Sequence, residues 1–347
     1  MKLSIVVPVY DVEVYLPRCL DSLLRQGLKA GEYEIVCVND GSPDGSAQIL
    51  ADYAERHPDI IRVITQENQG LGPARYTGTM AARGEYVAFV DSDDYLIDGA
   101  YAYLCEHFLQ GSPDVVHYDN KFVSTDGKTL VGDLSKVGQM SRYIYTDGKT
   151  LVDPQAQPKG TLIFDGDGAE AYNRMPLTFT WTKIIKRSFL VEHDLKAEPV
   201  VCQDELFNFA MFRLHPHTRV VSSSLYRYEQ ANPNSAQHTL NRHRTLRQLD
   251  ELLFHNTVIM EQYLSTELAD AARRSINLSI NTFYRRITRV RLSWHEWRRY
   301  HQRLLQLPPL HYPYDNPNWK TSVATTLKNL SRHSYLCYLL LFYVRPK

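Results

Sequence analysis

The acidic cluster Asp91-Ser92-Asp93-Asp94 contains the side chains best suited to chemistry in this chain. Two carboxylates at positions i and i+2 can reach one ligand through a turn, and carboxylate oxygens suit a hard cation such as Mg²⁺ or Mn²⁺. Proteins commonly hold such a cation with one or two carboxylates and the phosphates of a substrate. An acidic turn by itself is more often a solvated loop or a helix cap, but its position after a predicted buried strand favours a ligand site.

A second polar segment, residues 38–46, follows another predicted strand. Asp40 stands where a nucleobase could dock, because a carboxylate can accept the N–H of a uracil ring and the neighbouring glycines allow close approach of the backbone. The same residues could equally form an Asx turn, with Ser42 or Asp44 as a helix cap. Both interpretations stay open on these residues alone.

Two further segments contribute a basic residue and a carboxylate. Arg75 stands at a predicted helix start near the acidic cluster and could pair with Asp91 or with a phosphate. The nearby fragment Gly70-Leu71-Gly72 is a weak signal for a dinucleotide loop, since it follows the third predicted strand rather than the first. Asp204 leads into a predicted helix and is either a general base or an acid that caps the helix, which its spacing does not decide.

The elements that must position these side chains alternate along the first hundred residues. Short β-branched runs predict strands at residues 3–9, 34–39, 61–65 and 86–90, and amphipathic segments predict helices at residues 14–25, 47–56 and 73–83. This alternation is typical of a parallel sheet covered by helices, in which ligands bind outside the carboxyl ends of the strands. The polar residues after the four strands are therefore expected at one edge.

The rest of the chain has a different character. The heptapeptide TDGKTLV occurs at residues 125–131 and again at 146–152, and Asp-Gly between β-formers predicts two-residue hairpins. From residue 242 onward the pattern is helical, with arginines interleaved among aliphatic and aromatic residues up to residue 303. We therefore expect inserted hairpins followed by a helical region.

Composition limits the class of protein. The chain has 347 residues, 44% hydrophobic and 22% charged, which is typical of a globular protein with one large or two smaller domains. Its five cysteines are scattered without a C-x-x-C pair, which argues against a disulfide framework or a zinc site and favours a reducing compartment.

The N-terminus shows no secretory signal. The apolar run at residues 335–344 would rise only about 15 Å as a helix, too short for a hydrocarbon core of about 30 Å. A cytoplasmic location is expected.

Taken in order, the motifs between residue 4 and about residue 235 resemble inverting family 2 glycosyltransferases of the GT-A fold. The matching segments are SIVVPVYDVEVYLPRCLDSLLRQ, VNDGSPDGS, NQGLGPAR, GEYVAFVDSDD, FTWTKIIKRSFL, CQDELF and LYRYEQ. The resemblance implies an α/β domain over residues 1–235, Rossmann-like, with a mainly parallel sheet, helices on both faces and hairpins inserted at about 121–165. Residues 236–347 match no family motif and are expected to form a helical, basic C-terminal region.

The resemblance also implies which residues bind the donor. The expected nucleotide-binding residues are Pro8, Tyr10, Glu13, Asp40, Arg75, Asp91 and Ser92. Within this set, Asp40 would accept a hydrogen bond from uracil. Asp91 and Asp93 would hold Mn²⁺ or Mg²⁺ together with the diphosphate of the donor.

For catalysis, the resemblance implies that Asp204 is the base that deprotonates the acceptor hydroxyl and that Asp94 lies near the transferred sugar. Trp181 and Lys183 would flank the donor or the acceptor. The expected activity moves a sugar, with inversion, from a UDP-sugar to a hydroxyl of a glycan or lipid-linked acceptor, in the synthesis of a surface polysaccharide.

Four positions depart from the family's usual residues: Asp11, Tyr76 and Thr182 stand in place of Asn, and Gln203 stands in place of Glu. Because the carboxylates for the metal and the base are all present, an active enzyme is the favoured interpretation. An inactive module that binds a UDP-sugar is the alternative, which Tyr76 and Gln203 leave open.

Charge is distributed unevenly between the two ends of the chain. Residues 1–100 contain 8 Lys and Arg against 16 Asp and Glu, whereas residues 241–347 contain 17 against 7. A cationic helical surface fits peripheral docking on anionic lipid at the inner face of the cytoplasmic membrane, where a lipid-linked acceptor would be found. A solvated helical face is the simpler interpretation of the basic region, and a homodimer interface or a core helix explains the apolar run at residues 335–344 equally well. Nucleic acid is disfavoured as a partner, because the basic residues are not gathered with base-stacking motifs on a sheet.

Overall fold

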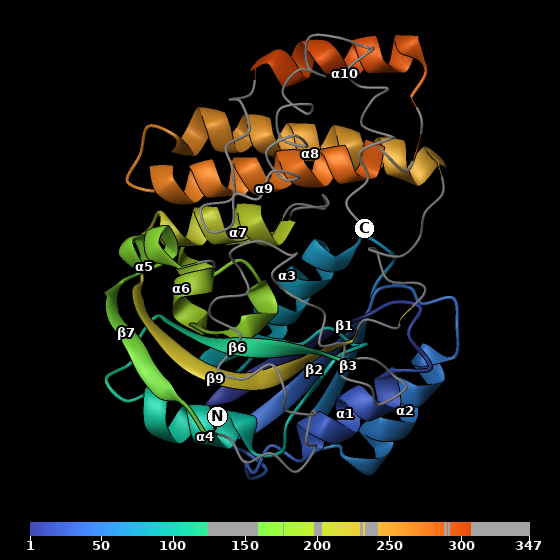
Figure 1. Ribbon diagram of the computed structural model, residues 1–347. Coiled ribbons are helices and arrows are strands. Elements are labelled where there is room, and N and C mark those ends of the chain that lie inside the picture. Colours follow the sequence, from blue (N-terminus) through green and yellow to red (C-terminus); the bar gives the residue numbers. More distant parts are fainter. Residues whose placement is uncertain are drawn as a thin grey trace. The chain divides into compact units, whose positions relative to one another are not determined.

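The computed structural model describes residues 1–123, 159–175, 177–197, 203–229, 232, 242–287, 290 and 292–306 (Figure 1). These residues fall in two compact units, of which one contains the sheet and the other contains the helices from residue 242 onward. The predicted hairpins at 125–131 and 146–152, the predicted boundary after residue 235 and the apolar run at 335–344 lie outside the described residues.

The N-terminal unit begins with four parallel strands. They are β1 (Leu3–Val9), β2 (Tyr33–Asn39), β3 (Ile61–Thr65) and β4 (Tyr86–Phe89), in the spatial order β3-β2-β1-β4. Every residue of β1 and β2 is buried, which is why these strands are nearly continuous apolar runs rather than alternating ones. The four predicted strands are confirmed to within one residue at each end.

The sheet continues beyond β4 with strands of mixed direction. β8 (Lys183–Lys186) pairs antiparallel with β4 and with β6 (Val115–Val123), and β6 runs parallel to β9 (His217–Glu229). β9 also pairs antiparallel with β7 (Thr161–Asp167) and with β5 (Tyr95–Leu96). Because β9 is 13 residues long, its first half pairs with β7 while Tyr226 and Arg227 pair with β5, next to the acidic cluster. β9 therefore reaches the edge of the sheet at which a ligand site is predicted.

Helices lie on both faces of this sheet, with α1 (Leu16–Leu24), α2 (Ser46–Arg56) and α4 (Ala100–Phe108) on one face (Figure 1). The other face carries α3 (Leu71–Ala81), α5 (Gly168–Arg174), α6 (Arg187–Glu192) and α7 (Gln203–Phe212). On β1, Ile5 and Val7 share a core with Leu16 of α1, whereas Val6 lies toward α3. Gly78 lets α3 approach closely, since a Cβ there would lie 2.3 Å from Val6 Cγ1.

The predicted helices of the first hundred residues are confirmed to within two residues. α1 begins at Leu16 with Pro17 in its first turn, a position that proline favours. Asp44, one of the two predicted caps of α2, accepts a hydrogen bond from Ser46 N at 3.1 Å, whereas Ser42 binds elsewhere.

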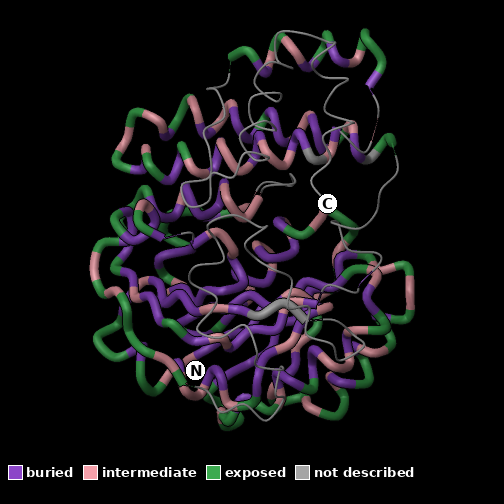
Figure 2. Tube along the Cα trace, viewed as in Figure 1, coloured by how far each residue is buried: buried purple, intermediate pink, exposed green. Residues whose placement is uncertain are grey.

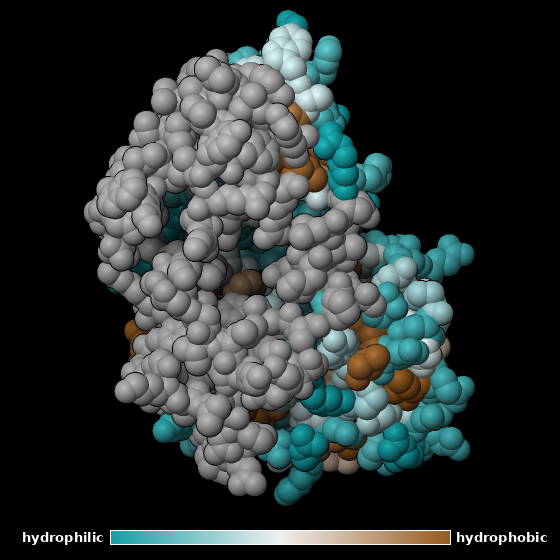
Figure 3. All heavy atoms as spheres, turned by 45° about the vertical axis from the view of Figure 1, so that its right-hand side comes forward, coloured by the Kyte–Doolittle hydropathy of each residue, from teal (hydrophilic) through white to brown (hydrophobic). Residues whose placement is uncertain are grey.

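Burial follows this layering. Figure 2 shows the strands buried along most of their length and the covering helices buried on one side. Cys19 and Cys37 are free thiols in this core and Cys105 is a half-buried free thiol, as the scattered spacing predicts, while Cys202 and Cys337 lie outside the described residues. On the face shown in Figure 3, hydrophilic side chains cover most of the described surface and apolar ones form only small groups.

The second unit contains α8 (Arg242–Tyr263), α9 (Ala269–Ile287) and α10 (Trp294–Gln306), in agreement with the predicted helical pattern. Arg242 pairs with Glu296 at 2.5 Å, and both Arg299 and Arg303 pair with Asp250, at 2.7 Å and 3.2 Å. These ion pairs join α8 to α10, so several of the arginines counted as a cationic face connect helices within the unit. Among the described residues, no helix is long and apolar enough to cross a membrane.

Candidate active site

The loops that follow the parallel strands meet at one edge of the sheet. The loop after β1 joins the loop after β2, because Glu13 N donates to Asp44 Oδ2 at 2.8 Å and Gly45 N donates to Glu13 Oε2 at 2.6 Å. Glu13, a predicted nucleoside contact, therefore uses its carboxylate to hold the start of α2. This pairing fixes the distance between two of the loops that would surround a nucleotide.

Asp40 holds the loop after β3 in the same way. It is buried, its Oδ1 accepts hydrogen bonds from Gln66 Nε2 at 2.8 Å and Gln69 N at 2.9 Å, and its Oδ2 accepts one from Gly70 N at 2.8 Å. An ionised carboxylate can accept about four hydrogen bonds, so one position remains for the N–H of a uracil ring. Contact of Asp40 with uracil stays a prediction that this geometry allows.

The end of β1 offers a ring to a nucleoside. Pro8 is buried opposite Val38 of β2, so it shapes the strand end, whereas Tyr10 is 47% exposed and its ring is open to stacking. Asp11 adopts a left-handed conformation with φ of 54°, and its N–H donates to Ser42 Oγ at 3.2 Å. Asn and Asp are the residues besides glycine that tolerate this conformation best, which explains how Asp can replace the family's usual Asn.

The acidic cluster follows β4, and its last residue is fully buried. Asp94 accepts hydrogen bonds from the Tyr226 hydroxyl at Oδ2 and from Glu229 N at Oδ1, both at 2.7 Å. Burial, and then the charges of Asp93 and Asp91, raise the pKa of Asp94 well above its ordinary value. Asp94 is thus fully buried, where its two hydrogen bonds fix the shape of the turn, and Ser92 is buried as well. The place of Asp94 near the transferred sugar stays a prediction.

Asp93, like Asp91, is an acid of this turn that is partly open to solvent. Asn232 Nδ2 donates to Asp93 Oδ2 at 2.8 Å. Arg18 Nη2 donates to the backbone carbonyl of Asp93 at 2.9 Å, and Arg18 Nη1 pairs with Glu229 at 2.9 Å. Burial and the neighbouring charge of Asp91 raise the pKa of Asp93 to about 6. A raised pKa of this origin marks a place with surplus negative charge.

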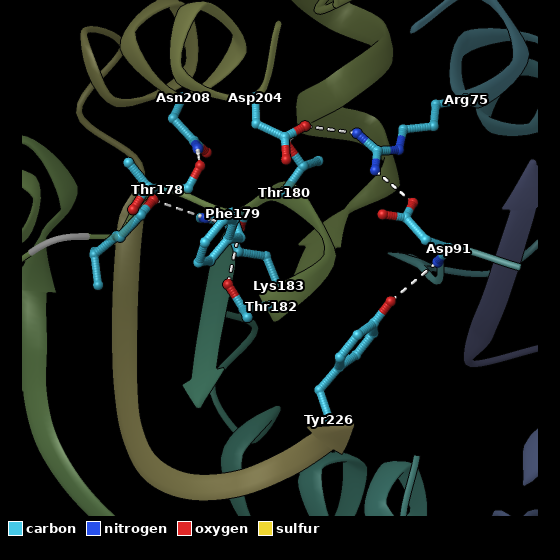
Figure 4. Close-up of polar contacts among 11 residues, drawn as sticks. Arg75, Asp91, Thr178, Phe179, Thr180, Thr182, Lys183, Asp204, Asn208 and Tyr226 are labelled. Atoms are coloured by element: carbon cyan, nitrogen blue, oxygen red, sulfur yellow. Dashed lines mark hydrogen bonds and ion pairs between the residues drawn. The ribbon is translucent and has the colours of Figure 1, made fainter. Parts of the chain in front are cut away.

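A single guanidinium joins the acidic turn to the predicted base (Figure 4). Arg75 Nη2 pairs with Asp91 Oδ1 and Arg75 Nη1 with Asp204 Oδ1, each at 2.6 Å. The Arg75 side chain is only 4% exposed. Burial alone would lower the pKa of Arg75, but the attraction of Asp91 and Asp204 outweighs it and raises that pKa. The pairing of Arg75 with Asp91 was one of the two alternatives from the sequence; the second pair, with Asp204, was not predicted.

Asp204 lies in the first turn of α7. Besides Arg75, its Oδ1 accepts a hydrogen bond from Thr180 Oγ1 at 3.0 Å, and its side chain is 24% exposed (Figure 4). Among the described residues its hydrogen bonds go to these two side chains and not to the backbone of α7, which weighs against the helix-capping interpretation. A carboxylate that is oriented from two sides and partly open to solvent is suited to accept a proton from a substrate.

Trp181 and Lys183 lie behind the site and not on its surface. Trp181 is 2% exposed and stacked on other rings, and Lys183 is fully buried with its ammonium donating to the carbonyls of Leu177 and Phe179. Burial lowers the pKa of Lys183 to about 7. In this structure neither side chain is placed to flank a donor or an acceptor, since both are enclosed by protein atoms.

The structure adds site residues that the sequence did not reveal. Thr180 contacts the base, and Tyr226, Glu229, Asn232 and Arg18 contact the acidic turn. The segment LYRYEQ, which contains Tyr226 and Glu229, was matched to the family but given no role. That match was the available signal, because nothing local in the segment shows that it packs against residues more than 130 positions earlier.

Two of the departures from the family have partners of their own. Tyr76 donates its hydroxyl to Asp194 at 2.9 Å, and the hydroxyl of Thr182 donates to Phe179 O at 2.8 Å. Gln203 differs, since its Oε1 is buried without a hydrogen-bond partner among the described residues.

The acidic turn fits a divalent cation that shares its ligands with a substrate. Asp91 and Asp93 supply two carboxylates, of which Asp91 is paired with Arg75, while burial and then the charge of Asp91 raise the pKa of Asp93 to about 6. Among the described residues, no group of three or more His, Cys, Asp and Glu side chains could hold a metal ion. Mg²⁺ or Mn²⁺ bound by one or two carboxylates and by phosphate oxygens matches this set, whereas a metal held by protein side chains alone does not.

Comparison with known proteins identifies the family of the N-terminal part of this chain. The family model "Glycosyl transferase family 2" matches residues 4–157. The chain is 34% identical over 237 residues to "Uncharacterized glycosyltransferase EpsJ" of Bacillus subtilis, a match that covers 67% of this chain and 62% of EpsJ. It is 43% identical over 97 residues to the poly(ribitol-phosphate) beta-glucosyltransferase of Bacillus spizizenii, covering 28% of this chain and 15% of that protein.

A solved structure shares the fold. The crystal structure of residues 1–349 of S. aureus TarS in complex with UDP-GlcNAc superposes with a TM-score of 0.66 at 18% identity, covering 99% of this chain and 91% of that one. The matches span about three fifths of the length of EpsJ and of its B. subtilis counterpart EpsH, at 62% and 60%. The family model over residues 4–157 and the identity to EpsJ over 237 residues show that this part of the chain belongs to glycosyltransferase family 2, while the solved structure shows the fold alone.

Proposed function

We propose that the protein is a metal-dependent, inverting glycosyltransferase that moves a sugar from a UDP-sugar to a hydroxyl group of a glycan or a lipid-linked acceptor. The observation that carries this proposal is the bridge of Arg75, which places the carboxylate of a donor-binding turn and an oriented base on either side of one guanidinium. Two curated relatives are named as transferases that act on poly(ribitol-phosphate), which supports a role in surface polysaccharide synthesis.

The reaction would be a single displacement. Asp204 removes the proton of the acceptor hydroxyl, the acceptor oxygen forms a bond to the anomeric carbon, and the bond from that carbon to the UDP oxygen breaks on the opposite face. The proton remains on Asp204 and the electron pair of the broken bond leaves with UDP. A general base contributes about 10² to 10⁴ fold to the rate, and orientation of the two substrates contributes further.

The charge of the leaving UDP needs compensation at the acidic turn. Mn²⁺ or Mg²⁺ held by Asp91 and Asp93 together with the diphosphate would stabilise that charge. Asp40 and Tyr10 would bind the uracil, and Glu13 would keep the two loops around it in place. Solved structures of the same fold include one in complex with UDP-GlcNAc and one in complex with GDP-Man and Mn²⁺, which supports a nucleotide sugar as the donor class.

The C-terminal unit would bring the enzyme to its acceptor. Its surplus of basic residues supports contact with anionic lipid on the cytoplasmic side, or a homodimer interface. Because Arg242, Arg299 and Arg303 are engaged within the unit, lipid contact would depend on the remaining basic residues. Binding to vesicles with and without phosphatidylglycerol, with the oligomeric state measured in parallel, distinguishes the two roles.

The test of the proposed function is UDP release from a panel of UDP-sugars, measured with Mn²⁺ and with a chelator, for the wild type and for Asp93→Ala. We expect one donor to release UDP in a metal-dependent way that Asp93→Ala abolishes. If no donor is turned over while UDP still binds with metal, the chain is the inactive binding module. If UDP does not bind at all, the assignment of the edge as a nucleotide site is wrong.

A further inference from the structure

We propose that the stacked rings of Phe179, Trp181 and Tyr226 are a rigid spacer that sets the distance between the donor-binding turn and the catalytic base, with Trp181 and Tyr226 as positioning residues. This inference rests on the proposed function, since it gives the spacer a turn and a base to separate. None of the three rings has to touch a substrate for this role.

The spacer is fixed to the donor side through one hydroxyl. The Tyr226 hydroxyl accepts a hydrogen bond from Asp91 N at 3.1 Å (Figure 4). It also donates to Asp94 Oδ2 at 2.7 Å, so it joins both ends of the acidic turn. Tyr226 is fully buried, and Glu229 N from the same strand supplies a second bond to Asp94. A residue 135 positions after Asp91 thus determines where Asp91 presents its carboxylate.

The rings themselves stack closely. The centroids of Trp181 and Tyr226 lie 4.3 Å apart with an interplanar angle of 24°, and those of Phe179 and Trp181 lie 4.5 Å apart at 17°. Tyr228 adds a third partner for Trp181, at 5.4 Å and 14°. Such stacked pairs stabilise beyond the area that they bury, and planar rings cannot shorten or extend as a flexible side chain can.

The other end of the spacer is fixed to the base. η3 (Thr180–Thr182) contains Trp181, and Thr180 Oγ1 donates to Asp204 at 3.0 Å (Figure 4). Asn208, one turn further along α7, donates to Thr178 O at 2.5 Å, so the helix of the base is attached to this turn twice. Lys183 holds the turn from behind by donating to the carbonyls of Leu177 and Phe179, at 2.9 Å and 2.5 Å.

Arg75 alone would not define this distance. It attracts Asp91 and Asp204 toward one charge, but its side chain has several rotatable bonds. The stack provides a second, stiff connection, which runs from the Asp91 amide and the Asp94 carboxylate of the acidic turn to Asp204. This matters because an error of about 1 Å in the relative position of reacting groups can reduce a rate by about 10² fold.

The test compares Tyr226→Phe with Tyr86→Phe. Both variants lose one buried tyrosine hydroxyl, but Tyr86 donates to Pro113 O, away from the turn and the base, and serves as the matched control. We expect Tyr226→Phe to lower kcat for transfer by about 10 to 10² fold while the donor KM and the melting temperature stay near those of Tyr86→Phe. A kcat of Tyr226→Phe equal to that of Tyr86→Phe would overturn the proposal. So would a fall in activity that is explained entirely by a higher donor KM and a lower melting temperature.

A double-mutant cycle then asks whether the two ends act through one spacer. If they do, the effects of Tyr226→Phe and Thr180→Val on kcat are non-additive, whereas Tyr86→Phe and Thr180→Val add. If the effects of Tyr226→Phe and Thr180→Val add while the wild type transfers sugar, the spacer is contradicted and the proposed function stands. If the wild type itself shows no transfer, the proposed function is contradicted, and the spacer with it. The two failures are therefore distinguishable.

Discussion

At the scale of single residues, Arg75 is the position at which charge and geometry are most closely coupled. Its two Nη atoms each serve a different carboxylate, which the single ammonium of lysine cannot reproduce. We expect Arg75→Lys to lower kcat by about 10² fold and to destabilise the fold by up to about 3 kcal/mol, because Asp91 and Asp204 are then left partly unpaired. Steady-state kinetics and urea unfolding measure the two effects; wild-type values in both would contradict the bridge.

Asp204 is tested by removing its basicity while keeping its shape. Asp204→Asn retains a hydrogen-bond acceptor for Thr180 and Arg75 but cannot take a proton, so we expect kcat to fall by at least about 10² fold with UDP affinity unchanged. Calorimetry with UDP and Mn²⁺ gives the affinity. The control is Asp98→Asn, an exposed acid paired with Arg25. Unchanged turnover in Asp204→Asn would remove Asp204 from the mechanism.

Lys183 predicts a pH dependence of stability. Its pKa is about 7 in the folded chain and 10.5 in an exposed lysine, so between these values the unfolded chain binds a proton that the folded chain does not. The contribution of Lys183 to stability is therefore lowest below about pH 7 and rises with pH toward 10.5. The neutral amine keeps two N–H groups, enough for its two carbonyl acceptors.

We expect the free energy of unfolding in urea to rise between pH 7 and 9 in the wild type and to rise less in Lys183→Met. Up to pH 9 the tyrosines stay mostly protonated in both states, so they change the measured slope little. A Lys183→Met curve parallel to that of the wild type would show that this lysine is charged in the folded chain.

At the scale of elements, the sequence predicted the parts whose signal is local. The strands at residues 3–9 and 61–65 and the helices around them follow from apolar periodicity within each segment. The loops at the strand ends could be named for the same reason, since parallel strands must end at one edge. Asp91, Asp93 and Asp204 were selected from the sequence, and the structure brings all three to that edge.

The parts that could not be predicted depend on pairing between distant segments. β9 takes its role from its register with β5, which places Tyr226 beside a turn more than 130 residues earlier. Trp181 and Lys183 were recognised as important, but their types do not show whether they face a ligand or a core. Burial of a lysine is uncommon, and here two carbonyl acceptors of the same turn make it possible.

The pairing of β7 with β9 includes surface contacts that respond to acid. His217 and Arg219 contact Asp165, and His215 contacts Asp167 at 2.8 Å. Burial alone would raise the pKa of both acids. Hydrogen bonds outweigh burial and lower each pKa below 3.8. The donors are His217 and Arg219 for Asp165, and mainly the Glu170 amide for Asp167. A carboxylate whose pKa is lowered by folding contributes its full stabilisation above about pH 3.8. That contribution is lost as the pH falls through the pKa of the folded state.

We therefore expect the double variant with Asp165→Asn and Asp167→Asn to lose less stability than the wild type when the pH falls from 4 to 2. The difference should be small, under about 1 kcal/mol, because these side chains are well exposed and screened by solvent. Urea midpoints across this range measure it. A variant that follows the wild-type acid curve would show that the histidine–aspartate contacts do not stabilise the β7–β9 pair.

At the scale of the whole molecule, charge is divided in a way that the fold partly explains. The acidic surplus of residues 1–100 includes Asp40, Asp91 and Asp93, which gather at the edge proposed to bind a cation and a diphosphate. Several arginines of the basic C-terminal region pair with acids of their own unit, such as Arg273 with Asp270. The acidic surplus of the first unit is thus available to the proposed cation, while basic residues of the second unit pair with acids within one helix, as Arg273 does, or between helices, as Arg299 does with Asp250.

The two units also predict how the molecule unfolds. Each described unit has a buried core of its own: Ile5 and Leu16 belong to the first, Leu249 and Phe283 to the second. UDP and Mn²⁺ would bind to residues of the first unit, and a ligand present at about 100 times its Kd stabilises the form that binds it by about 2.7 kcal/mol. We therefore expect calorimetry to show two transitions, of which only one moves upward with UDP and Mn²⁺.

Asp93→Ala should abolish that upward shift without moving the other transition, because it removes a predicted metal ligand that lies within the first unit. Signals from Trp181 in the first unit and from Trp294 and Trp297 in the second can assign the transitions. If UDP and Mn²⁺ raise both transitions together, the units unfold as one cooperative body, and the stability of the nucleotide site is then coupled to the helices of the C-terminal unit.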